Sequence, residues 1–427
     1  MNYKFLKPVP ETPAIKEAMS RVSSREESGL PVYDFSSGNI GRLLMEYKVF
    51  SDIDIKTGEM PEEFRPISDA LKSGIKKAFA GSPDGLSYSP TGGTESQKKT
   101  VVRYFNQIHD IPIGEEDTDK VVVTAGGQQA LAGALRSISP SSKVISPRWD
   151  YAPMTAIASD EMWEYVKLPA DKNGLGFSLE DLREEATENS VFYTSMPNNP
   201  SGYVSPEKMK ATCDIMAEAG GGIIWDAPYL FTMFKLQGGR AAFESSFLED
   251  QIKEFKSVAK KHADRLCLLS SISKTCLAAG LRYGFAYAPE DWIENINAIL
   301  GRECLSSPTP SFLMGNEILN AFLNNKANLH EWVTKILAGR VNYLLEKEIP
   351  LMLPENGKFG ALYVLMKTKE DGEEVADKLA EKGIISIKAA PFFGERVNAV
   401  RLSLVSVPYV QGDDLWKENV EKLARTI

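Results

Sequence analysis

Residues 120–131 read KVVVTAGGQQAL, and this stretch decides the fold class. The run Val121-Val122-Val123 lacks the polar alternation of a strand with one wet face, so it predicts a strand buried on both faces. A Gly-Gly turn follows and leads into a predicted helix, Gln128–Ile138, whose apolar residues recur at helical spacing. Strand, glycine turn and helix in this order indicate an α/β domain.

Further short apolar, β-rich runs predict the other strands of the same sheet, namely Ser142–Ser146, Glu164–Leu168, Val191–Ser195, Gly222–Trp225, Leu266–Ser270 and Tyr283–Ala288. Helices are expected between them. One begins at Ser205-Pro206-Glu207, because serine is a good N-cap and proline suits the first helical position. Another covers Phe247–His262. We therefore predict a mostly parallel, seven-stranded sheet between helices.

The two ends of the chain have a different pattern. Residues 1–60 are proline-rich and are predicted to be irregular. A long helix is predicted from Pro308 to about Lys347, and the segments after it are Ala361–Lys367, a helix near Gly372–Lys382, Ala399–Val405 and a last helix near Gly412–Arg425. We expect an N-terminal segment, residues 1–63, that joins a smaller α+β domain, residues 302–427. The large domain then covers residues 64–301.

Composition excludes several classes of partner. The chain has 427 residues, which predicts two packed units, and a formal net charge of -9, which argues against nucleic acid or an anionic membrane surface. Its four cysteines form no C-x-x-C pair and its three histidines are scattered, so no metal site is predicted. No apolar run approaches the length of a membrane span, and a cytoplasmic protein is expected.

Three local motifs bear reactive side chains. Ser271-Ile272-Ser273-Lys274 follows a predicted strand and is itself followed by Gly280, Arg282 and Gly284. Asp226 ends the run Gly222-Ile223-Ile224-Trp225, with Tyr229 three residues later. Asn199 lies in the turn Pro197-Asn198-Asn199-Pro200-Ser201-Gly202. Taken alone, each has a simple structural interpretation, respectively a solvated lysine, a helix cap and a polar turn.

In this order and spacing, the motifs resemble those of the fold-type I pyridoxal-phosphate (PLP) enzymes, specifically the class I/II aminotransferases (aspartate-aminotransferase-like). The resemblance runs from about Tyr33 to Val405. It implies a Schiff base between Lys274 and the cofactor, and an ion pair between Asp226 and the pyridine nitrogen. It also implies that Tyr229 and Asn199 contact the ring oxygen O3′. The implied catalytic residues are Lys274, Asp226 and Tyr229.

The resemblance implies further cofactor contacts. Ser271, Ser273 and Arg282 are expected at the cofactor phosphate, together with the glycine turn and helix start formed by Gly126, Gly127 and Gln128. Trp149 is expected to stack on the ring, although it could instead be a core tryptophan. Tyr88, in Tyr88-Ser89-Pro90, is expected to reach the neighbouring active site of a homodimer. The sequence departs from the family at Tyr283 and at Gln97-Lys98.

Substrate contacts complete the prediction. Arg401, in Val400-Arg401-Leu402-Ser403, is expected to bind the substrate carboxylate with Asn199 and the backbone of Gly38. Phe392 and Phe393 either line an apolar substrate pocket or belong to the core. The predicted function is PLP-dependent transfer of an amino group between an α-amino acid and a 2-oxo acid. The alternatives are another PLP reaction (β-lyase, synthase or decarboxylase) or a non-catalytic ligand-binding relative.

Overall fold

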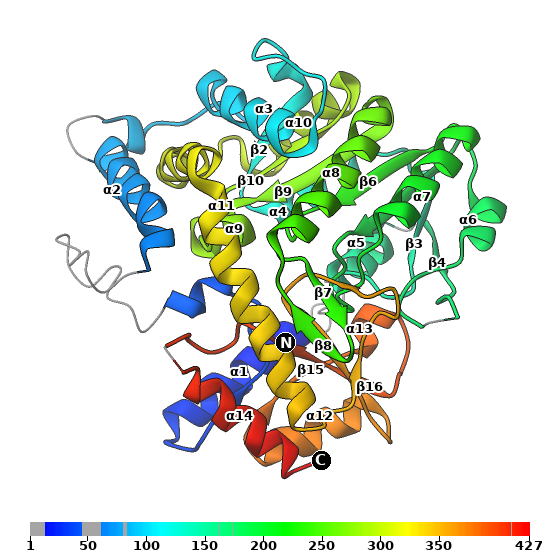
Figure 1. Ribbon diagram of the computed structural model, residues 1–427. Helices are drawn as coiled ribbons and strands as arrows, with labels where there is room; N and C mark the ends of the chain where they lie inside the picture. Colours follow the sequence, from blue (N-terminus) through cyan, green and yellow to red (C-terminus); the bar gives the residue numbers. More distant parts are fainter. Residues whose placement is uncertain (1–12, 45–60, 80–82, 162, 173, 411) are drawn as a thin grey trace, which may run out of the picture.

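A sheet of seven strands organises the larger part of the molecule, in the order β2-β10-β9-β6-β5-β3-β4 (Figure 1). The structure is a computed structural model that describes residues 13–44, 61–79, 83–161, 163–172, 174–410 and 412–427. Only β10 runs antiparallel to its neighbours in this sheet. Its strands coincide with the predicted runs: β2 (Val121–Thr124), β3 (Lys143–Pro147), β4 (Glu164–Leu168), β5 (Ser190–Ser195), β6 (Gly222–Asp226), β9 (Leu266–Ser271) and β10 (Gly284–Tyr287).

Both faces of this sheet are covered by helices, which is why its strands lack alternation. In β9, Leu266 and Leu268 pack into one core, and Cys267 and Leu269 pack into the other. The first core includes side chains of α3 (Glu95–His109), α7 (Pro206–Ala219) and α8 (Ser245–Lys261). The second includes side chains of α4 (Gly127–Arg136), α5 (Ala152–Glu161) and α10 (Glu290–Cys304). The predicted α/β class is confirmed.

A smaller part of the molecule is built around the four-stranded sheet β11-β13-β16-β15. Its strands are β11 (Leu351–Met352), β13 (Tyr363–Lys367), β15 (Ile387–Lys388) and β16 (Ala399–Ser403). Three helices pack on or beside it: α12 (Gly372–Glu381), α13 (Ala390–Phe393) and α14 (Asp414–Ala424). The N-terminal segment joins this part, because β1 (Tyr33–Asp34) pairs in parallel with β14 (Ile384–Ile385).

The expectation of an irregular N-terminus is wrong for residues 14–27. These residues form α1 (Ala14–Glu27), whose Ala18 and Val22 are buried in the core. The rest of that expectation falls largely on residues 1–12 and 45–60, which lie outside the described residues. The helix predicted after Pro308 is confirmed as α11 (Thr309–Glu346), which packs along α2 (Arg65–Phe79) and extends from the large part of the molecule into the smaller part, yellow in Figure 1.

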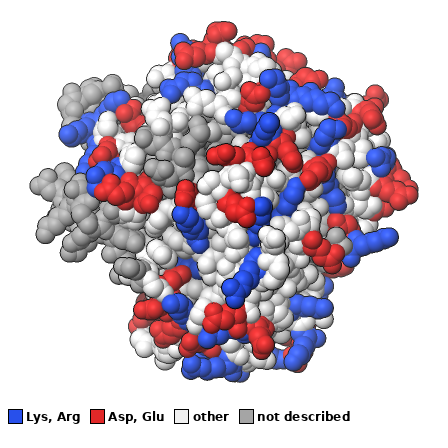
Figure 2. Space-filling model, in the orientation of Figure 1, with Lys and Arg blue, Asp and Glu red and all other residues white. Residues whose placement is uncertain are grey.

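A three-stranded sheet links the two parts. The hairpin of β7 (Phe234–Gln237) and β8 (Arg240–Ala242) pairs with β12 (Lys358–Phe359). Two short helices complete the fold, α6 (Leu179–Glu185) and α9 (Ile272–Thr275). On the face drawn in Figure 2, acidic and basic side chains are interspersed, without a broad area of one sign. Among the described residues, no helix is long and apolar enough to cross a membrane.

Candidate active site

A cavity of about 160 Å³ lies where strands of the large sheet end. Ser195, Asp226 and Ser271 are the last residues of β5, β6 and β9, and this is the edge at which open α/β sheets bind ligands. Arg282 lies at the same edge because it precedes the antiparallel strand β10. The lining residues are Gly127, Gln128, Tyr151, Ser195, Asn199, Asp226, Pro228, Tyr229, Ser271, Ser273, Lys274, Ala279 and Arg282.

One end of the cavity has donors suited to a phosphate group. The first turn of α4 begins at Gly127, and among the described residues no backbone acceptor bonds to the N–H groups of Gly127 and Gln128, whereas the N–H of Gln129 bonds to the Gly126 carbonyl oxygen. Gly126 has φ +89°, a conformation that favours glycine, and a Cβ on it would lie 2.2 Å from the Arg282 guanidinium where that group now lies. The Ser273 Oγ is buried without a hydrogen-bond partner among the described residues. This donor set fits a bound phosphate.

Asp226 faces the cavity as its main carboxylate. Burial and, to a smaller extent, the nearby Asp150 carboxylate raise the pKa of Asp226 to about 7, although the Lys274 ammonium opposes the rise. Lys274 is half-buried and donates a hydrogen bond from Nζ to the Gly38 carbonyl oxygen, 2.5 Å away. One enclosed space therefore holds the Lys274 amine together with the Asp226 carboxyl group, whose pKa is elevated.

Arg401 lies beside the cavity, behind Asn199. Its guanidinium donates to the Asn199 Oδ1 at 3.2 Å and to the Ser36 carbonyl at 3.4 Å. The guanidinium carbon also lies 4.1 Å from the centre of the Tyr363 ring and 4.7 Å from that of Phe392. Arg401 is 1% exposed, and among the described residues no carboxylate forms an ion pair with it. A buried arginine without a counterion is suited to an anionic ligand.

Most of the predicted site residues are brought together. Nine line the cavity: Gly127, Gln128, Asn199, Asp226, Tyr229, Ser271, Ser273, Lys274 and Arg282. Three others touch lining residues, since Gly126 lies against Arg282, Gly38 accepts from Lys274 and Arg401 donates to Asn199. Tyr88 does not reach this cavity within one chain; it is 86% exposed.

The expected position of Trp149 requires a correction. Its indole N–H donates to the Gly174 carbonyl at 3.0 Å, and its ring packs against Phe393, so it is a buried residue outside the cavity lining. Tyr151, two residues later, lines the cavity instead. Trp149 and Tyr151 both follow β3 in the sequence, and the path of the chain after β3 decides which of the two rings faces the cavity.

Two buried residues beside the cavity, Asp150 and Tyr363, were also missed from the sequence. Asp150 is 2% exposed and accepts hydrogen bonds from the Ser195 hydroxyl at 2.5 Å and the Tyr151 backbone N–H at 2.7 Å. The Ser195 hydroxyl oxygen in turn accepts from the Asn199 N–H at 3.1 Å. Tyr363 forms side-chain hydrogen bonds with Tyr229 and Lys274. Neither belongs to the motifs around Lys274, Asp226 and Asn199, so those motifs offered no sign of them.

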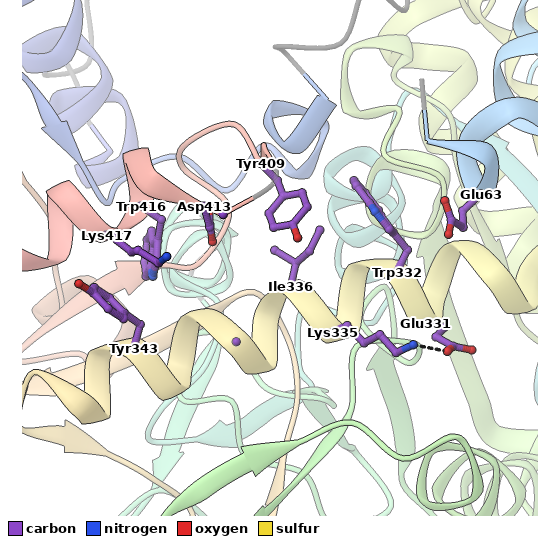
Figure 3. A pocket seen from close by; sticks show the side chains of 12 residues that line it. Glu63, Glu331, Trp332, Lys335, Ile336, Tyr343, Tyr409, Asp413, Trp416 and Lys417 are labelled. Atoms are coloured by element: carbon purple, nitrogen blue, oxygen red, sulfur yellow. Dashed lines mark hydrogen bonds and ion pairs between the residues drawn. The ribbon is translucent and has the colours of Figure 1, made fainter. Parts of the chain in front are cut away.

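A larger groove, of about 580 Å³, lies elsewhere on the molecule (Figure 3). It runs between α11 and α14, and aromatic side chains such as Trp332, Tyr409 and Tyr343 line it. Of its charged groups, Lys335 is paired with Glu331 at 2.5 Å. The groove contains none of the predicted site residues, so the smaller cavity is the candidate active site. Among the described residues, no cluster of potential ligands could hold a metal ion.

Fold and site together define a class of enzyme. A family model for aminotransferase class I and II matches residues 52–410, and the chain belongs to this family. The fold is that of the aspartate aminotransferase of Thermus thermophilus, solved with maleate: the TM-score is 0.78 at 16% identity, over 99% of this chain and 100% of that one.

Relatives in sequence are named for different substrates. The chain is 25% identical over 353 residues to a probable aspartate/prephenate aminotransferase of Thermus aquaticus, covering 80% of this chain and 83% of the relative. It is 23% identical over 381 residues to a probable N-acetyl-LL-diaminopimelate aminotransferase of Bacillus subtilis, covering 87% and 88%. Because relatives with different substrates match about equally, the amino donor is left open.

Proposed function

We propose that the protein binds pyridoxal 5′-phosphate and moves an amino group between an α-amino acid and a 2-oxo acid. The observation that carries this proposal is the meeting of Lys274, Asp226 and the phosphate-type donor set in one cavity. When bound, the cofactor supplies an aldehyde that combines with amines and a ring that accepts electrons from the substrate Cα.

Different residues of the cavity would bind different parts of the cofactor. Lys274 would hold the aldehyde carbon, and Asp226 would face the ring nitrogen. The first turn of α4, with Ser271, Ser273 and Arg282, would hold the phosphate. A protonated ring nitrogen beside Asp226 would favour its ionised form and so oppose the burial that raises its pKa.

The substrate would bind at the end of the site near Arg401 and Asn199, away from the phosphate donors. Arg401 binds the α-carboxylate, because its buried guanidinium has no carboxylate partner among the described residues. Asn199 is placed to share that contact through its hydrogen bond with Arg401. The free amine of Lys274 takes the proton from the substrate Cα and returns it later in the reaction.

A homodimer is part of the proposal. Tyr88 and Leu86 are each 86% exposed and Leu305 is 67% exposed, and large apolar side chains exposed to this degree are typical of an interface. Mixing Lys274→Ala subunits with Tyr88→Phe subunits tests the expected reach of Tyr88. Activity returns in the mixed dimers if each site combines Lys274 of one chain with Tyr88 of the other, and it does not return if both residues serve the same site.

Cofactor uptake and a half-reaction test the function as a whole. The purified protein should bind pyridoxal phosphate and acquire its visible absorption band, and an amino acid alone should convert the cofactor to pyridoxamine phosphate. Lys274→Ala should abolish the conversion. A protein that binds no pyridoxal phosphate and stays colourless would indicate a non-catalytic relative. Release of carbon dioxide or of a β-substituent from the amino acid would indicate another PLP reaction. A panel of dicarboxylic, aromatic and aliphatic donors then identifies the substrate class.

A further inference from the structure

Tyr363 lies at a junction of four predicted functional residues. It is the first residue of β13, is 3% exposed, and comes from the small sheet rather than the cavity edge of the large one. Its hydroxyl is hydrogen-bonded to the side chains of Lys274 and Tyr229. Its ring lies 4.1 Å from the Arg401 guanidinium carbon.

Gly38 shows that the position of the Tyr363 hydroxyl is built into the fold. A Cβ on Gly38 would lie 2.1 Å from the Tyr363 Oη, well inside van der Waals contact, whereas the next atom, Cζ, would be 3.1 Å away. The Gly38 carbonyl oxygen accepts the hydrogen bond from Lys274 Nζ at 2.5 Å. The absence of a side chain at residue 38 therefore lets the hydroxyl and the carbonyl converge on one amine.

The charges around Tyr363 favour its role as a hydrogen-bond acceptor. Burial by itself raises the pKa of the Tyr363 hydroxyl, but the Lys274 and Arg401 cations and the hydrogen bonds from Tyr229 and Lys274 outweigh burial and lower it. The pKa of Tyr229, in contrast, is raised by burial and by Tyr363. Tyr229 accordingly donates to Tyr363, and Tyr363 presents its oxygen to the lysine.

We propose that Tyr363 is a further catalytic residue, whose hydroxyl, with the Gly38 carbonyl, holds the Lys274 amine beside Arg401 whenever that amine is free. The proposal rests on the proposed function, in which Lys274 is released from the cofactor and moves the substrate proton. A lysine side chain has many rotamers, and fixing its amine near the bound carboxylate keeps it within reach of the substrate Cα.

Tyr363→Phe is the test variant, because it removes the hydroxyl and keeps the ring against Arg401. Tyr343→Phe is the matched control: it removes a hydroxyl that bonds to Glu421 at 3.0 Å, on α11 and away from the cavity. The first readout needs no bound cofactor. Reductive methylation of the cofactor-free protein, with mass spectrometry of the peptide that contains Lys274, measures how available that amine is.

We expect Lys274 to be methylated roughly three- to tenfold faster in Tyr363→Phe, since the amine loses one of its two hydrogen-bond acceptors. The control should match the wild type. Equal rates in the wild type and Tyr363→Phe would overturn the proposal, whether or not the protein proves to be an aminotransferase.

The second readout uses the PLP-loaded protein and an amino acid with deuterium at Cα. In Tyr363→Phe we expect the half-reaction to slow by roughly tenfold to a hundredfold, with a larger isotope effect, because a misplaced base slows proton transfer. The apparent affinity for the amino acid should change less than about threefold, because Arg401 retains its aromatic neighbour. An unchanged isotope effect and rate would overturn the proposal while leaving the proposed function intact.

A double-mutant cycle with Gly38→Ala uses the predicted clash. The added methyl group should displace the hydroxyl and so raise the methylation rate of Lys274 when Tyr363 is present. In the Tyr363→Phe background the clashing oxygen is absent, and Gly38→Ala should add little. Equal effects of Gly38→Ala in both backgrounds would overturn the link between these residues. If the wild type takes up no cofactor, the proposed function fails, and the methylation rates still decide the role of Tyr363.

Discussion

Asp150→Asn should change how the stability of the cofactor-free protein depends on pH. Burial raises the pKa of Asp150 from 3.8 to about 7, although hydrogen bonds from Ser195 and Tyr151 oppose the rise. Between these two values the folded protein keeps a proton that the unfolded chain has lost. The contribution of Asp150 to stability is therefore complete below pH 3.8 and is lost as the pH rises through about 7.

The size of this effect follows from the two pKa values. From about pH 5 to about pH 7.5, the wild type should lose roughly 2.5 kcal/mol of unfolding free energy through Asp150 alone. Lys167 is the neighbouring cation, and burial lowers its pKa to about 8, so it stays charged over most of this range. Asparagine does not titrate, so the variant should lack this slope and show only a constant offset for its altered hydrogen bonds.

Urea unfolding of both proteins over that pH range measures the difference. Asp117→Asn is the control, because a hydrogen bond from Lys120 lowers the pKa of Asp117 and its contribution is constant above its ordinary value. The control curve should run parallel to the wild type. Parallel curves for Asp150→Asn and the wild type would refute the argument that Asp150 is protonated in the folded protein at about pH 5.

Four further variants test the site. Ser273→Ala should weaken binding of pyridoxal phosphate about tenfold by removing a donor, but not binding of pyridoxal, which lacks the phosphate; equal losses in the two titrations would contradict a phosphate contact. Arg401→Lys should raise the KM for the amino acid roughly tenfold to a hundredfold, because lysine lacks the planar guanidinium that can bind a carboxylate through two hydrogen bonds. A KM within twofold of the wild type would argue against a contact between Arg401 and the substrate carboxylate. Tyr151→Ala should shift the absorption band of the bound cofactor. Trp149→Ala should instead lower the free energy of unfolding by about 3–5 kcal/mol and leave the band unchanged. The reverse pattern would indicate that Trp149 is the residue that stacks on the cofactor.

The sequence predicted the large sheet well because its strands are buried on both faces. Such strands appear as continuous apolar runs, for example Val121-Val122-Val123, that need no knowledge of the partner strand. The helix α1 was missed for the opposite reason. Most of its side chains are polar, and the buried Ala18 and Val22 give too weak a periodic signal to distinguish it from an irregular segment.

Some residues of the candidate site could be predicted from the sequence and others could not. Lys274, Asp226 and Asn199 were predicted because each lies in a short motif at the end of a strand, where neighbours in sequence are also neighbours in space. Tyr363 and Asp150 could not be found in this way. Tyr363 reaches Lys274 only because the small sheet packs against the large one, and Asp150 is set by a turn whose path depends on contacts with Ser195 and Phe392.

Under the proposed function, the arginine for the substrate carboxylate lies on β16 and the cofactor-binding lysine lies after β9, so substrate binding and cofactor binding come from separate parts of the chain. Arg401, Tyr363 and Phe392 come from the small sheet and α13, whereas Asp226 and the phosphate donors come from the large sheet. Substitutions around Phe392 can therefore retune which amino acid is accepted without rebuilding cofactor capture. Directed evolution of this enzyme toward new donors is best aimed at α13, because β13 and β16 carry Tyr363 and Arg401.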